Sequence, residues 1–214
     1  MKSDRKFQGV ACTAFVRGAA GIGAFLVLVS VAGGQERKPM SATSRDAEDM
    51  ISGWPARPRE VARRMIAKYG QPEEVTATRL IWMNNGPWKE TILSREEIPH
   101  KFPKAHTDLL EQRIDYRVPP DRFDELANYD GSVIAERTRG TLAARCDKEE
   151  MNFLALNLAH EVATGKRSVD DARRFYARTA RAFMEGKQDP YTQRLQFSVP
   201  PGATADPDEE FMGK

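Results

Sequence analysis

The chain has little cysteine and histidine, and beyond its N-terminus it has no excess of charge. Of its 214 residues, two are cysteine and three are histidine. Cys12 lies in the N-terminal segment, so only Cys146 remains in the rest, and no intramolecular disulfide can form there. Leaving out the charged residues up to position 17 reduces 33 basic and 31 acidic residues to 29 and 30. This balance argues against nucleic acid as a partner.

The common catalytic signatures are also missing. The sequence contains no Gly-x-Ser-x-Gly, no glycine-rich loop before Lys-Ser/Thr and no Cys-x-x-Cys. These absences remove the usual hydrolase, phosphate-loop and dithiol classes. We expect no cofactor.

What is present at the start of the chain is the pattern of an export signal, over residues 1–33. A basic segment that ends at Arg17 precedes an apolar run, and Ser30-Val31-Ala32 is a small-residue cleavage pattern. It predicts a mature N-terminus near Gly33 and a periplasmic location. The alternative is an uncleaved anchor that associates with the inner membrane through residues 10–33. The apolar run after Arg17 is shorter than the roughly 20 apolar residues of a membrane span, and extending it back to Val10 places Arg17 inside it.

The rest of the chain divides by composition. Residues 34–53 are small and polar and predict a flexible tether, and residues 200–214 have the composition of a disordered tail. The segment between them, 54–199, is long enough for a single domain with its own core.

Periodicity predicts an α+β domain. An antiparallel sheet of two hairpins plus a central strand packs against an N-terminal helix and a C-terminal helical pair. The expected helices cover 58–69, 120–128, 148–164 and a segment from 168, and the expected strands cover 75–83, 88–95, 110–118, 132–137 and 141–146.

The segment 99–108 holds two of the three histidines, His100 and His106. Neutral imidazoles are good ligands for zinc, copper or iron, so one interpretation is a metal site. Its third ligand would be Asp108, Glu111 or His160.

The alternative is a connection that Pro99 and Pro103 hold extended, with histidines that hydrogen-bond locally. The spacing matches no recognised histidine motif, and Lys101 and Lys104 would repel a cation. We therefore expect a recognition surface here, without a bound metal.

A polar stripe on the predicted helix 148–164 is a second candidate, and it consists of Asn157, His160, Glu161 and Thr164. A histidine beside a carboxylate is a typical general base. The stripe lies opposite the apolar face, however, and this position favours an ordinary solvated surface.

Cys146 is a third candidate, at a junction between a strand and a helix. Arg145 and the helix N-terminus favour a reactive thiolate, whereas Asp147 opposes one. A lone cysteine at the end of an apolar strand is more often a small buried hydrophobe, which is our expectation.

Trp54, Trp82 and Trp88 are rigid amphipathic groups of the kind that anchor contacts. We expect Trp82 to pack against the first helix. The candidate binding surface combines the aromatic and histidine features, namely Trp82, Trp88, His100, His106 and Asp108.

Three runs, 100–112, 129–133 and 144–159, resemble those of a group of exported bacterial proteins described only as hypothetical, and this likeness implies no activity. The first helix with the segment 68–75 and a hairpin loosely resembles the small periplasmic lipoproteins of outer-membrane assembly.

The leading hypothesis is an exported, non-catalytic binding or accessory protein in the periplasm or at the outer face of the inner membrane. Its expected partner is a protein or a membrane complex. The alternative is a metal- or thiol-dependent enzyme that uses His100, His106, His160 or Cys146.

Overall fold

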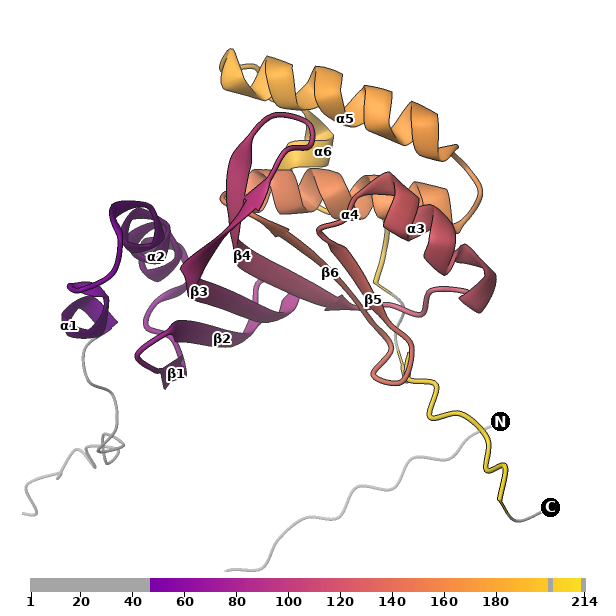
Figure 1. Ribbon diagram of the computed structural model, residues 1–214, viewed down its shortest axis with the longest axis horizontal. Helices are drawn as coiled ribbons and strands as arrows, with labels where there is room; N and C mark the ends of the chain where they lie inside the picture. Colours follow the sequence, from indigo (N-terminus) through magenta and orange to yellow (C-terminus); the bar gives the residue numbers. More distant parts are fainter. Residues whose placement is uncertain (1–46, 200–201, 213–214) are drawn as a thin grey trace, which may run out of the picture. The chain divides into compact units, whose positions relative to one another are not determined.

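The computed structural model describes residues 47–199 and 202–212, which belong to one compact unit (Figure 1). The predicted export signal therefore lies outside the described residues. The helices are α1 (Ala47–Ile51), α2 (Ala56–Tyr69), α3 (Phe123–Tyr129), α4 (Glu149–Ala163), α5 (Val169–Met184) and α6 (Pro190–Gln193), with a 3-10 turn at Pro120–Arg122. The strands are β1 (Glu74–Val75), β2 (Arg79–Asn85), β3 (Trp88–His100), β4 (His106–Asp115), β5 (Val133–Glu136) and β6 (Thr141–Cys146).

The strands form one antiparallel sheet in the order β1-β2-β3-β4-β6-β5. Both predicted hairpins, β2–β3 and β5–β6, are confirmed, and β4 is the central strand that joins them. The predicted α+β architecture is therefore confirmed.

Some boundaries differ from the prediction. The expected strand 75–83 is interrupted, because the Thr76 hydroxyl accepts the backbone N–H of Arg79 and closes a turn between β1 and β2. β3 continues to His100 and β4 begins at His106, since the two strands stay paired beyond a bulge between Leu93 and Ile98.

The two faces of the sheet are chemically different. Leu80, Leu93, Leu110 and Cys146 are register neighbours across four strands, and all are buried. The opposite face carries charged pairs, such as Glu111 with its register partner Arg145. Such alternation is typical of an antiparallel sheet that is covered on one side.

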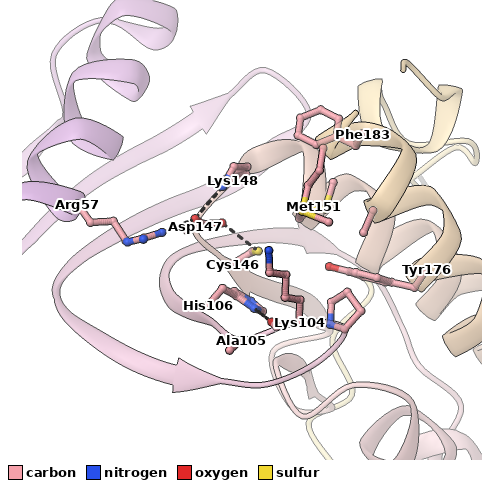
Figure 2. Close-up of a pocket in the computed structure, with 13 residues that line it drawn as sticks. Arg57, Lys104, Ala105, His106, Cys146, Asp147, Lys148, Met151, Tyr176 and Phe183 are labelled. Atoms are coloured by element: carbon pink, nitrogen blue, oxygen red, sulfur yellow. Dashed lines mark hydrogen bonds and ion pairs between the residues drawn. The ribbon is translucent and has the colours of Figure 1, made fainter. Parts of the chain in front are cut away.

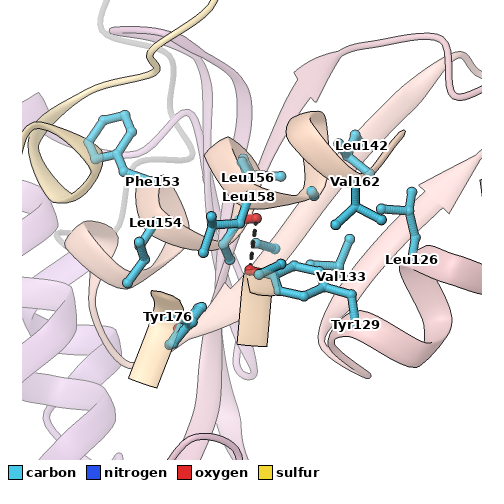
Figure 3. Close-up of a cluster of buried hydrophobic side chains, with 14 of the residues drawn as sticks. Leu126, Tyr129, Val133, Leu142, Phe153, Leu154, Leu156, Leu158, Val162 and Tyr176 are labelled. Carbon is cyan, nitrogen blue, oxygen red and sulfur yellow. Dashed lines mark hydrogen bonds between the residues drawn. The ribbon is translucent and has the colours of Figure 1, made fainter. Parts of the chain in front are cut away.

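Helix α4 is the centre of the larger core (Figure 3). It packs on β4 and β6, and α3, α5 and α6 contact it as well. Thirteen of its 15 residues are buried, because these neighbours surround it. The labelled side chains are Phe153, Leu154, Leu156, Leu158 and Val162 of α4 and, from its neighbours, Leu126, Tyr129, Val133, Leu142 and Tyr176.

Helix α2 packs on the other part of the sheet. Its buried residues Val61, Ala62 and Met65 contact a cluster that includes Trp82, which confirms the expected packing of that tryptophan. Gly70 ends the helix at φ +82°, where its N–H bonds to the carbonyl of Ile66. Glycine reaches this backbone conformation without steric cost.

The predicted tether 34–53 is wrong for residues 47–53. Ala47 and Ile51 lie four residues apart in α1, and both are fully buried against the cluster beneath α2. The local composition is polar and does not reveal this contact, because only these two side chains provide it. Residues 34–46 lie outside the described residues.

The predicted disordered tail 200–214 also needs correction. The Thr204 hydroxyl donates to the carbonyl of Gly140 at 2.6 Å, and Asp206 forms ion pairs with Arg117 and Arg137. A Cβ on Gly140 would lie 2.2 Å from the backbone of Thr204, so the close approach requires glycine. The segment around 204–206 is thus docked on the β5–β6 turn.

Within the described ranges 47–199 and 202–212, no helix has both the length and the apolar character needed to cross a membrane.

Candidate functional site

His100 and His106 lie at the end of a hairpin rather than in a long loop. His100 is the last residue of β3, His106 is the first of β4, and the two are register partners. Asp108 follows in β4, with its Oδ1 atom 3.1 Å from His106 Nε2 and its Oδ2 atom 3.3 Å from His100 Nδ1. The structure thus brings together three of the residues that the sequence suggested.

The other two proposed ligands lie elsewhere. Glu111 accepts a hydrogen bond from Arg145 Nε at 2.7 Å across the strand pair β4–β6. His160 Nδ1 lies 2.8 Å from the Tyr116 hydroxyl oxygen. The His160 ring stacks on that of Phe197, with ring centroids 4.2 Å apart. Neither belongs to the cluster of His100, His106 and Asp108.

Two residues that the sequence analysis missed join this cluster from the segment between α3 and β5. The Ser132 hydroxyl donates to Asp108 Oδ2 and lies 3.1 Å from His100 Nδ1, and Asp130 Oδ1 lies 3.6 Å from His100 Nε2. In the sequence these residues indicate only a turn. Their contact with a hairpin some 30 residues earlier depends on the strand order.

Charge and burial shift the pKa values of two residues in and beside the cluster, His106 and Asp130. The carboxylate of Asp108 raises the pKa of His106 to about 11, and Cys146 contributes in the same direction. Burial raises the pKa of Asp130, and the nearby Asp108 adds to this effect.

Ser132, His100 and Asp130 are the residue types of a serine-hydrolase triad, but their arrangement does not suit nucleophilic catalysis. The hydroxyl proton of Ser132 is donated to Asp108 and not to the imidazole, and Ser132 is itself buried. A nucleophile must pass its proton to the base and reach the substrate. The cluster is better suited to hold a cation or a proton.

A pocket of about 230 Å³ lies beside the cluster (Figure 2). The start of α2, the β3–β4 turn, the β6–α4 junction, α4 and α5 all contribute to its lining, which includes His106 and Cys146. One wall is apolar and consists of Met151, Tyr176, Ala180, Phe183 and Met184.

The polar side of the pocket is mainly basic, with Arg57, Lys104 and Lys148 against a single acid, Asp147. Arg57 Nη1 and Lys148 Nζ lie 2.7 and 2.8 Å from the same oxygen of Asp147. Its carboxylate therefore has a pKa below the ordinary value: burial alone would raise it, but these cations outweigh burial.

Two polar groups of the pocket have no protein partner. The Tyr176 hydroxyl and the Lys104 ammonium group point into the pocket (Figure 2), and within the described segments neither makes a hydrogen bond or an ion pair through these atoms. Burial raises the pKa of Tyr176 well above its usual value, so the hydroxyl keeps its proton. Both groups are free to donate to a ligand.

Cys146 lines the pocket but is 96% buried, with only 4% of its surface exposed. Burial raises the pKa of its thiol, although His106 acts in the opposite direction. Arg145, which we considered as an activating cation, pairs with Glu111 instead. The Cys146 thiol therefore keeps its proton.

The prediction that Trp82 and Trp88 belong to a binding surface is wrong. Trp82 and Trp88 are each 1% exposed, so neither can contact a partner without unfolding. The Trp82 indole donates to the carbonyl of Gly70, and that of Trp88 donates to Glu149 Oε1 at 2.6 Å. Their indole N–H groups satisfy buried acceptors and are not available to a partner. Trp54 is likewise buried.

The expected solvated stripe on α4 is wrong for all but Thr164, because α6 and neighbouring segments cover the rest. Asn157 is buried and donates to the carbonyls of Tyr191 in α6 and of Arg194 just after it. Glu161 is buried with Arg167 Nε 2.5 Å away. His160 is half-buried, and burial lowers its pKa. Thr164 is exposed at the C-terminus of the helix.

No protein-family model matches the chain, and comparisons with the curated proteins and the solved structures find no match either.

Proposed function

We propose that this chain is an exported, non-catalytic binding protein whose ligand is a small organic anion with an apolar part. The observation that carries the proposal is the pocket beside His106, in which an unpaired hydroxyl and an unpaired ammonium group face an apolar wall. Ligand sites typically combine an apolar lining with a few convergent polar groups.

The apolar wall favours a hydrocarbon part in the ligand. Met151 and Phe183 supply a flexible thioether and an aromatic ring, which adapt well to small apolar shapes. The volume of about 230 Å³ is below the roughly 300–1,000 Å³ of pockets for drug-sized molecules, so the ligand is smaller than these.

The charges favour an anion. Asp147 is already paired with both Arg57 and Lys148, so the cations of the pocket outnumber its acid. The remaining Lys104 and the protonated Tyr176 hydroxyl are hydrogen-bond donors. A carboxylate would accept from both, and charge-assisted hydrogen bonds of this kind are stronger than neutral ones.

The same site offers weak support for the thiol-dependent form of the alternative, a metal- or thiol-dependent enzyme. Cys146 is buried and its pKa is raised, whereas a catalytic thiol needs an accessible thiolate. Ligand binding without catalysis therefore fits the site better. The partner of such an accessory protein would be another protein or a membrane complex.

Hexanoate is a suitable probe, because it combines a carboxylate with a short hydrocarbon chain. We expect the full chain to bind hexanoate in a calorimetric titration, and to bind 1-hexanol at least roughly tenfold more weakly, since a charged hydrogen bond contributes about 1.5–3 kcal/mol. Tyr176→Phe removes one donor and should weaken hexanoate binding roughly threefold to tenfold.

Lys104→Met should also weaken hexanoate binding, and Lys101→Met is the matched control. Both lysines are exposed residues of the β3–β4 turn, but only Lys104 lines the pocket. Equal binding of hexanoate and hexanol, or equal losses in the two lysine variants, would contradict the proposal.

The export part of the proposal rests on the order of basic, apolar and small residues in 1–33. We expect the native protein to begin close to Gly33, as measured by mass spectrometry of the N-terminus. An intact Met1 in the membrane fraction would instead favour the anchor through residues 10–33.

A further inference from the structure

The polar cluster behind the pocket has the composition of a metal site. His100 and His106 each offer a ring nitrogen and Asp108 a carboxylate oxygen, and these ligand atoms all lie within 4.8 Å of one another. The histidines are register partners at the end of a hairpin, so the backbone pairing fixes their separation. Small side-chain rotations would bring the three atoms onto one ion.

A second observation points to a missing ligand. The Asp108 side chain is 4% exposed, yet its Oδ1 atom accepts no hydrogen bond. Its contact there is the ion pair with His106 Nε2 at 3.1 Å. A buried carboxylate oxygen that accepts no hydrogen bond is rare, and a cation bound between this oxygen and the imidazole would coordinate both.

The surroundings already orient the three residues as outer contacts orient metal ligands. His106 Nδ1 lies 2.8 Å from the carbonyl of Lys104, which leaves Nε2 toward Asp108. His100 Nε2 faces the carboxylate of Asp130, and the Ser132 hydroxyl donates to Asp108 Oδ2. Metal-bound histidines and carboxylates usually have such second contacts.

We infer that His100, His106 and Asp108 bind a divalent transition metal, with zinc as the representative ion. Two imidazoles and one carboxylate suit zinc and its first-row neighbours, whereas magnesium and calcium prefer oxygen ligands. Three protein ligands leave a coordination position open. His106 also lines the proposed anion pocket, but the inference rests on the cluster and not on the ligand of that pocket.

The turn lysines do not exclude the ion. Lys101 and Lys104 are exposed, so solvent screens their charges, whereas Asp108 and Asp130 are buried beside the imidazoles. The ion would take the place of the proton on His106 Nε2, because only a neutral imidazole donates a lone pair to a metal.

The test is a calorimetric titration of the full chain, without an affinity tag, with zinc chloride. We expect one zinc per chain. Asp108→Asn and His106→Gln should each weaken binding at least tenfold, while His160→Gln, which changes the one histidine outside the cluster, should leave it unchanged. A zinc concentration a hundredfold above Kd should raise Tm by roughly 5–10 °C.

Zinc binding that is absent, or that survives both cluster variants, would overturn the inference. X-ray absorption of the zinc-loaded wild-type chain gives an answer even if the variants fail to fold. We expect nitrogen and oxygen neighbours at about 2.0–2.2 Å, including two imidazoles. A sulfur neighbour at about 2.3 Å would assign the ion to Cys146 and contradict the set of three.

Discussion

Glu149→Ala is expected to lower the free energy of unfolding by roughly 3–5 kcal/mol, measured by denaturant unfolding. Glu149 opens α4 and is 4% exposed. Its Oε1 atom accepts from Trp88 Nε1 at 2.6 Å and from Gln112 Nε2 at 3.0 Å, and Tyr69 and Lys68 donate to the same carboxylate. Its removal leaves buried donors from β3 and β4 without an acceptor.

The matched control is Glu150→Ala, the next residue of α4, which is not buried and has no such network. We expect a change within about 0.5 kcal/mol for this variant. Equal losses for the two glutamates would mean that the network contributes little.

Because of the same carboxylate, we expect the stability of the fold to depend on pH. Burial alone would raise the pKa of Glu149, but the hydrogen bonds from Lys68, Tyr69 and Trp88 outweigh it and hold the pKa below the usual 4.5. Because the folded pKa is depressed, this stabilisation is complete above about pH 4.5 and is lost as the pH falls through the folded value. The stability difference between wild type and Glu149→Ala should therefore shrink in acid.

Leu158→Ala is expected to cost roughly 2–5 kcal/mol, since a buried leucine leaves a cavity when it is truncated. Leu158 is fully buried on α4 between the sheet and the outer helices, as is Leu154, for which we expect a similar loss. Thermal or denaturant unfolding of each variant measures the effect.

Met184→Ala is the control for an apolar side chain of similar size, because Met184 is 60% exposed at the end of α5. It should change stability by no more than about 0.5 kcal/mol. A Leu158 variant as stable as the Met184 variant would contradict the assignment of α4 to the core.

Much of the fold was predictable because its elements have strong local signals. The Asn-Gly-Pro turn between β2 and β3 and the Ser168 cap of α5 specify their neighbours through short-range chemistry. The side of α4 that α6 covers was not predictable. Asn157 and Glu161 are polar like surface residues, and only the return of the chain at Tyr191 buries them.

The candidate site shows the same limit. The sequence indicated His100, His106 and Asp108 because of their residue types and their closeness in the chain, whereas their pairing at the end of a hairpin appears only in the structure. Ser132 and the wall residue Tyr176 come from distant segments, and their sequence neighbourhood carries no sign of a shared site. Packing of α5 over the β3–β4 turn creates the pocket, and no local pattern encodes that contact.

The central claim, an anion with an apolar part in the pocket beside His106, is tested most directly by a crystal structure of the chain with hexanoate. We predict the carboxylate within hydrogen-bond distance of the Tyr176 hydroxyl and the Lys104 ammonium group, with the hydrocarbon chain against Met151 and Phe183. An empty pocket at saturating hexanoate, or hexanoate bound only elsewhere, would contradict the account.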